Sequence, residues 1–249
     1  MSKKYLDTTA PAIGEILVSL LLLFYLCTGP ARADDPGWSI TQSGQIYGRS
    51  QFAITAKGFR TDCLDAGYTL VSAAPSWKIF LFNEKSKSYF PFNAEATTNV
   101  SSGRTSLLRT ALMRNADECY WRKAYKTKFK GHDITVWRTA PKNPKVSKNF
   151  KVMELWTADE IPLAREIAAF DHKVNGLPKE MANLPLRCFA VASKRARSAF
   201  IETTSIEPGA FPVTKFRVPQ GYKLARNEID VVMNTDDLSN ILEGIGGDK

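Results

Sequence analysis

The two histidines, His132 and His172, are the side chains best suited to proton transfer or metal binding at neutral pH. They fall on different expected elements, and no cysteine or carboxylate stands at metal-ligand spacing from either. The sequence contains no G-x-S-x-G elbow, no G-x-x-x-x-G-K-[ST] loop, no H-E-x-x-H and no G-x-G-x-x-G. We therefore predict a protein that is not an enzyme, that needs no cofactor or metal, and whose histidines are surface or capping residues.

Neighbouring carboxylates occur at Asp117-Glu118 and at Asp159-Glu160. We expect both pairs to adjoin helix ends, where negative charge complements the helix dipole. A general acid and base would have to be brought together in space, which adjacency in the sequence does not indicate.

Three cysteines, Cys63, Cys119 and Cys188, lie beyond the N-terminal segment. An oxidising compartment permits one disulfide among them, and the sequence does not choose among the three pairs. Their spacing is too long for a CxxC metal or redox motif. Burial as small apolar residues is the alternative.

The N-terminus has the order of a secretory signal: Lys3 and Lys4, an apolar run over 16–27, and Ala31-Arg32-Ala33 as a cleavage site. We predict a cleaved signal at 1–33, a single domain at 34–233 and a disordered tail at 234–249. The working protein then begins at Asp34 and is exported to the periplasm or cell envelope.

The chain is basic, with a formal charge of +9, and thirteen Lys or Arg lie between Arg104 and Lys151 against three acidic residues. Such a field attracts polyanions. After export, an anionic membrane surface or an envelope polymer is a more natural partner than nucleic acid, which we do not expect. A solvated basic face is the alternative, and the oligomeric state is left open.

The first half of the mature chain alternates strand and turn signals, which is typical of an antiparallel meander. The expected strands are 38–47, 50–57, 59–64, 68–73, 77–83 and 88–92. In the fifth, Trp77, Ile79 and Leu81 point to one face while Phe80 and Phe82 point to the other. Both faces of this sheet are therefore apolar, and at least one needs a cover.

Helices are the expected cover. Apolar residues recur at helical spacing around Leu108 and Leu112, which predicts an amphipathic helix over 104–128, and a second helix is expected over 159–173 with Gly176 after its end. The remaining expected strands are 129–139, 150–157, a hairpin of 186–192 with 196–204, and a last strand at 214–218.

Two stretches resemble the LolA-like superfamily of periplasmic lipoprotein carriers. The first is Phe52–Asp62 with Gly67–Ser72, Trp77–Asn83 and Tyr89, and the second is Thr214–Lys223 with its Pro-x-Gly turn. The resemblance implies an α+β fold: a curved antiparallel sheet, or incomplete β-barrel, with helices covering the concave face. It also implies that the concave face holds acyl chains.

The first hypothesis is an exported, non-enzymatic protein that binds a lipid or a lipidated partner protein in this half-barrel. The expected cavity walls are Ile54, Leu70, Ile79, Phe80, Leu81, Phe82, Leu108 and Leu112, and Arg60 is an expected anion partner at the rim. The alternatives are a solvated turn arginine and, for the whole, a structural or interaction protein of the cell envelope with a filled core and no ligand. A cavity of ~300 Å³ or more favours ligand binding.

Overall fold

The computed structural model describes residues 34–44, 48–92, 119–143, 145, 152–191 and 197–232, which belong to a compact unit beginning at Asp34. Some expectations concern residues outside this description. They are those for 1–33, 234–249, Leu108, Leu112, Asp117 and Glu118. The boundaries of the signal, domain and tail stay predictions.

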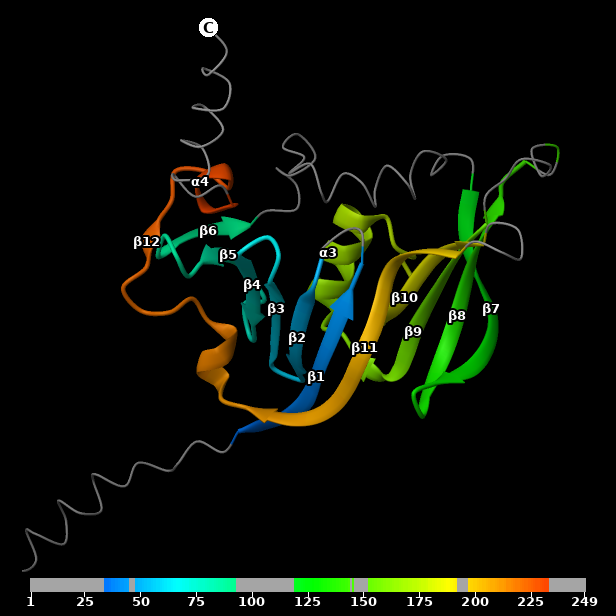
Figure 1. Ribbon diagram of the computed structural model, residues 1–249, viewed down its shortest axis with the longest axis horizontal. Helices are drawn as coiled ribbons and strands as arrows, with labels where there is room; N and C mark the ends of the chain where they lie inside the picture. Colours follow the sequence, from blue (N-terminus) through cyan, green and yellow to red (C-terminus); the bar gives the residue numbers. More distant parts are fainter. Residues whose placement is uncertain are drawn as a thin grey trace, which may run out of the picture. The chain divides into compact units, whose positions relative to one another are not determined.

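A single twelve-stranded sheet dominates this unit (Figure 1). Its order is β12-β6-β5-β4-β3-β2-β1-β11-β10-β9-β8-β7, so two antiparallel meanders join where β1 pairs with β11. The strands are β1 (Asp35–Ser43), β2 (Ser50–Thr55), β3 (Gly58–Cys63), β4 (Tyr68–Ala73), β5 (Ile79–Asn83), β6 (Ser88–Phe92), β7 (Cys119–Phe129), β8 (His132–Pro141), β9 (Met153–Pro162), β10 (Asn183–Val191), β11 (Arg197–Phe211) and β12 (Lys223–Leu224). Of these strands, only the two-residue β12 pairs in parallel, with β6.

The predicted meander is confirmed. Strands β4 and β6 have the expected bounds, and the expected hairpin in the second half is formed by β10 and β11. The expectation that both faces of the sheet are apolar also holds, because the neighbouring residues Leu81 and Phe82 are 1% and 0% exposed on opposite faces of β5.

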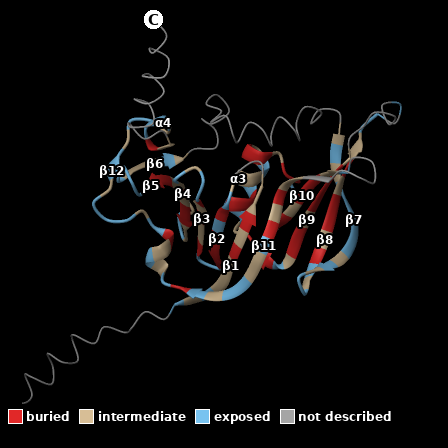
Figure 2. Ribbon diagram, viewed as in Figure 1, coloured by how far each residue is buried: buried red, intermediate tan, exposed pale blue. Residues whose placement is uncertain are grey.

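Different segments cover the two faces of β1–β5. Helix α3 (Arg165–Asn175) inserts Ile167 and Ala168 into a core cluster with Ile40 and Ile54, on what we name the α3 face. On the opposite face, a 3₁₀ turn η3 (Val213–Phe216) packs Phe216 against Ala53. Figure 2 shows the resulting buried positions along these strands and on α3.

The predicted fold class is wrong. The structure is mostly sheet, and the described residues hold only two α-helices, α3 and the single turn α4 (Ile229–Val232), so helices do not form a layer over the concave face. Among these residues, no helix combines the length and apolarity needed to cross a membrane.

Residues 119–128, expected as the end of a helix, form most of β7. Tyr120, Trp121 and Tyr125 favour extended backbone, and Lys130-Gly131, with φ of 51° and 88°, makes the tight turn that pairs β7 with β8. The strand expected to begin at Phe129 therefore begins at His132. The rest of the expected helix lies outside the described residues.

The second expected helix starts six residues late, because 159–162 continue β9 beside β10. It ends at Asn175, two residues beyond the expected end, and Gly176 follows it as predicted, in the left-handed conformation. The strand expected at 214–218 is instead η3, since backbone bonds from Lys215 to Pro212 and from Arg217 to Thr214 tighten the chain and place Phe216 over the sheet.

Replacing Phe216 with Ala should lower the free energy of unfolding by about 3–5 kcal/mol, because a fully buried ring is removed from one face of the sheet. Urea denaturation followed by circular dichroism measures this change. Leu224→Ala, at a 64% exposed position, is the control and should change stability by less than about 0.5 kcal/mol. Equal effects of the two substitutions would contradict the packing described for Phe216.

Candidate binding surfaces of the sheet

The hollow between the α3 face and α3 is nearly filled. A cavity of ≈40 Å³ remains there, with Phe52, Phe59 and Leu70 on the sheet side and Phe170 and Asp171 on α3. Since one water needs roughly 10–15 Å³ of such space, this volume suits a few waters.

The predicted lipid-binding residues divide between the two faces. Strand register places Ile54, Leu70, Ile79 and Leu81 on the α3 face, where Leu70 borders the cavity and Ile54 is buried in the core. Phe80 and Phe82 project from the opposite face, where the rings of Phe82 and Tyr222 lie 5.6 Å apart. The six described members of the predicted set are thus divided between the two faces, Leu108 and Leu112 lie outside the described residues, and whether any of the eight binds lipid stays a prediction.

Arg60 lies on the opposite face with Phe82, away from the cavity. Its guanidinium bonds to Asp62 at 2.7 Å, reaches Glu84 at 3.4 Å, and stacks 5.5 Å from the Phe82 ring centre. Thr69 donates to the same Asp62 carboxylate at 2.7 Å. These contacts make Arg60 part of the packing beneath the C-terminal segment, and the role at a cavity rim stays a prediction.

Asp171 is the ionisable residue at the wall of the small cavity. Burial raises the pKa of Asp171 to about 7, and a hydrogen bond from Asn175 Nδ2, at 3.0 Å, partly offsets that rise. The Oδ1 atom of Asn175 is buried without a hydrogen-bond partner among the described residues. This corner of the cavity is therefore the polar part of an apolar lining.

A buried carboxylate, Glu154, organises the strands farther along the sheet. It is 3% exposed and accepts hydrogen bonds from Arg138 at 2.7 Å, from Trp156 Nε1 at 2.7 Å and from the Tyr125 hydroxyl at 3.2 Å. Desolvation raises the pKa of Tyr125, and the neighbouring Glu154 charge adds to the rise. The sequence analysis did not predict this cluster, because its residues come together only when β7, β8 and β9 pair in this register.

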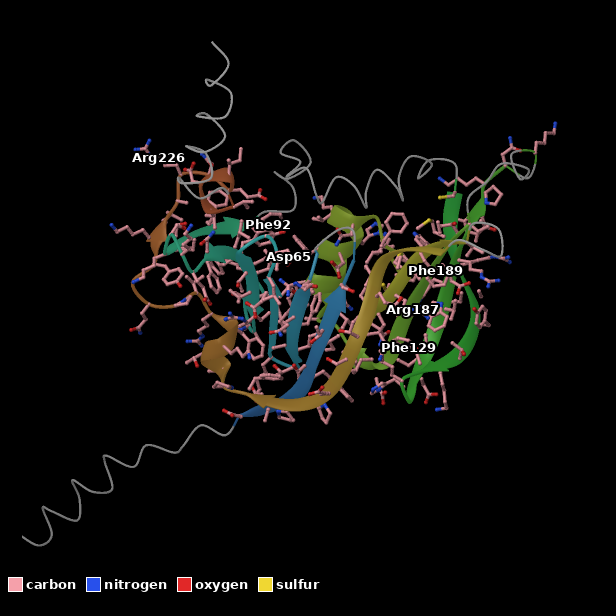
Figure 3. The ribbon with its side chains drawn as sticks, viewed as in Figure 1. Asp65, Phe92, Phe129, Arg187, Phe189 and Arg226 are labelled. Carbon is pink, nitrogen blue, oxygen red and sulfur yellow. The ribbon has the colours of Figure 1, made fainter. Side chains whose placement is uncertain are left out.

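An arginine stacked among aromatic rings lies next to the Glu154 cluster. The Arg187 guanidinium is 4.9 Å from the Trp156 ring centre, 5.1 Å from Phe129 and 5.6 Å from Phe189, and it bonds to Glu202 at 2.9 Å (Figure 3). Cation–π contact and an ion pair together hold the charge of Arg187 among apolar groups.

A second hollow, of ≈520 Å³, is an open groove beside β7. Its lining includes Lys123, Lys126, Trp137, Asp159 and Glu180. Desolvation raises the pKa of Asp159, but hydrogen bonds from Thr135 and Lys126 outweigh it and hold the pKa below its ordinary value. The groove is thus a charged surface with both signs of charge.

Each of the two histidines contacts neighbouring residues of the fold. His132 pairs with Glu160 and packs edge-on against Trp38, with ring centres 5.5 Å apart. His172, near the end of α3, contacts the Leu177 carbonyl at 2.6 Å. Asp159 and Glu160 are strand residues and do not adjoin a helix end, which corrects that expectation. Among the described residues, no three His, Cys, Asp or Glu are grouped to hold a metal ion.

Cys63 and Cys188 are buried thiols that form no disulfide in the structure. Burial raises the pKa of each thiol to about 12. Cys119 begins β7 and is half-buried.

No family model matches the chain, and a search of curated proteins gives no match. An uncharacterized conserved protein from Thermus thermophilus shares 13% identity over 87% of this chain and 100% of its own, with a TM-score of 0.40. The MucA/MucB complex from Pseudomonas aeruginosa shares 10% identity over 76% of this chain and 56% of its own, with a TM-score of 0.32. A LolA superfamily protein from Nitrosomonas europaea shares 8% identity over 76% of this chain and 91% of its own, with a TM-score of 0.17. The structural neighbours thus include MucB and a LolA-superfamily protein, but TM-scores below 0.5 support no argument about function.

Asp171 should make stability depend on pH. In the unfolded chain an aspartate has a pKa of about 3.9, whereas the folded value is raised to about 7. Between these values mainly the folded state holds the proton, so the stability that Asp171 contributes is fully present below about pH 4 and is lost as pH rises to about 7. Asp171→Asn should remove this fall and be more stable than wild type above pH 7. Urea titrations from pH 4 to 8 measure it, with exposed Asp230→Asn as control. A wild-type slope that persists in Asp171→Asn would contradict the assignment.

Cys63 and Cys188 should resist iodoacetamide at pH 8 in the folded protein, because burial excludes the reagent and keeps both thiols protonated. Both should react fully in guanidinium chloride. Peptide mass spectrometry of labelled samples resolves each site, and rapid native labelling of either cysteine would count against its buried position.

Proposed function

We propose that the mature chain is an exported, non-catalytic protein that acts by binding another component of the cell envelope, with its sheet as a filled scaffold. The observation that carries this proposal is the ≈40 Å³ left between α3 and the sheet. Ligand pockets for molecules of drug size occupy roughly 300–1,000 Å³. Binding through the outer surface is therefore better supported than enclosure of a ligand.

The polar clusters also favour binding over catalysis. An active site needs polar groups that converge on space open to a substrate. Glu154 is instead saturated by three side-chain donors, and Arg187 is enclosed by rings and Glu202. These clusters support a rigid surface and leave no group poised for acid–base chemistry within them.

Export rests on the sequence of residues 1–33. The order of lysines, apolar run and Ala31-Arg32-Ala33 is that of a secretory signal. Export would bring this basic chain, with a formal charge of +9 before cleavage, into contact with the components of the periplasm or cell envelope.

A lipid or lipidated protein as ligand is the second candidate, and the apolar lining by Phe52, Phe59 and Leu70 favours it. An acyl chain would need more room than ≈40 Å³, so α3 would have to move away from the α3 face. The two candidates therefore predict different masses for the purified protein.

Native mass spectrometry with lipid extraction separates them. The full chain is produced in an exporting bacterium and purified from the envelope fraction, and we expect the mass of a chain that begins at Asp34 with no bound lipid. Lipid that co-purifies and is lost in Leu70→Phe, which fills the cavity, would favour the second candidate. Retention of residues 1–33 would contradict cleavage after export.

Partner binding itself is tested by lysine-directed crosslinking of the mature protein in the envelope fraction. We expect at least one discrete protein adduct, with crosslink sites mapped by peptide mass spectrometry. The same reaction in detergent-denatured extract is the control. If crosslinking in the native envelope fraction gives no protein adduct, that result would contradict the proposed function.

A further inference from the structure

The two edges of the twelve-stranded sheet differ in length. One edge ends in β12, a strand of two residues, whereas the other ends in β7, a strand of eleven residues. An edge strand presents backbone N–H and C=O groups that another strand can pair with. At ~3.3 Å per residue, β7 offers roughly 36 Å of such edge.

Over residues 120–129, the outer side of β7 is open among the described residues. The ladder of these residues runs to β8 alone, and the backbone hydrogen bonds of turns and loops join them to no other described segment. Residues 122–126 are exposed in succession, and Tyr120 and Tyr125 are 50% and 41% exposed. Figure 2 shows this exposure along β7.

A β-bulge aligns the lysines of β7 on one face. The register shifts between Lys123 and Tyr125, so Lys123, Lys126 and Lys128 lie opposite Trp137, Thr135 and Asp133, which are alternate residues of β8. Without the bulge, Lys123 would project from the other face. We name these three lysines the lysine row, and two of them line the ≈520 Å³ groove.

Charge determines which strand can pair there. Four of the eleven β7 residues are Lys or Arg and none is acidic. A second copy of β7 would set like charges directly opposite one another, which destabilises strand pairing. An acidic residue at every second position would instead meet the lysine row.

We propose, resting on the proposed function, that β7 is the docking edge for an extended acidic segment of a partner protein. The segment adds as a thirteenth strand, and its alternate Asp or Glu side chains face the lysine row. Lys126 and Lys128 already pair with Asp159 and Asp133 at 2.9 and 2.8 Å, so the partner carboxylates join these exposed pairs. Backbone pairing supplies affinity and the charge pattern supplies selectivity.

The test uses a nine-residue fluorescein-labelled peptide with Glu at odd and Val or Thr at even positions, and fluorescence anisotropy with the mature wild-type protein at low salt. Two matched peptides carry backbone N-methyl groups, one at the odd and one at the even positions. Methylation of one set should abolish binding, while methylation of the other should leave the affinity within about threefold, because only alternate N–H groups face a paired strand. Equal effects of the two sets would overturn strand pairing.

A charge test accompanies it. Lys123→Glu with Lys126→Glu should weaken binding by about tenfold or more, since attraction becomes repulsion. Lys78→Glu with Lys223→Glu changes two exposed lysines outside the groove by the same net charge and should leave affinity nearly unchanged. Equal losses in the two double variants would overturn the assignment to β7.

A third experiment measures binding of the protein to vesicles that contain phosphatidylglycerol, an anionic lipid. Binding to these vesicles that requires Lys123 and Lys126, with no binding of the peptide, would overturn the peptide proposal in favour of a membrane surface. Absence of peptide binding while crosslinks still form from other lysines would overturn this inference and leave the proposed function standing. Loss of both peptide binding and envelope crosslinks would overturn both.

Discussion

The fold depends on the need to keep water from both faces of one sheet. Leu81 and Phe82 are adjacent on β5 and point in opposite directions, yet both are fully buried. A single covering layer cannot bury the side chains on both faces of such a strand. Helix α3 closes one face, and the chain after the fifteen-residue strand β11 returns across the other. The fit there is close: a Cβ atom added at Gly58 would lie 2.2 Å from the Phe216 ring. The absence of a side chain at position 58 is therefore what lets the C-terminal segment cover this face.

The strands on the other side of the β1–β11 pair are held together by a different kind of interaction. Glu154 brings a negative charge into the sheet, which is costly unless the charge is paired and hydrogen-bonded. Arg138, Trp156 and Tyr125 supply those bonds from three neighbouring strands. Because each partner must stay in register to bond, the network fixes the alignment of β7, β8 and β9 more narrowly than apolar packing would. The position of β7 at the edge is thus tied to a buried carboxylate.

The sequence was informative where the signal is local. Alternating apolar residues and turn residues predicted β4 and β6, and the two-sided apolar pattern around Phe80 predicted that both faces are apolar and that at least one is covered. Helical periodicity misled over 119–128, because matches carried over from Leu108 and Leu112 outweighed the aromatic residues that favour a strand. The Glu154 network and the small size of the cavity depend on residues distant in sequence and on how fully side chains fill space. Neither property has a periodicity that a single sequence displays.

Among the described residues, only ≈40 Å³ is left between α3 and the sheet. Under the proposed function, recognition therefore falls to the surface and to the ends of the sheet, and those ends are built differently. At one end β12 offers two residues, too few for another strand to pair with extensively. At the other, the lysine row on β7 discourages self-pairing by charge, a common protection of long edge strands. The same protection is selective, because it opposes basic or identical strands and not acidic ones. The bulge between Lys123 and Tyr125 matters to both effects, since it concentrates the positive charge on the face that carries the groove. A structural safeguard against aggregation and a selective edge can therefore arise from one set of side chains.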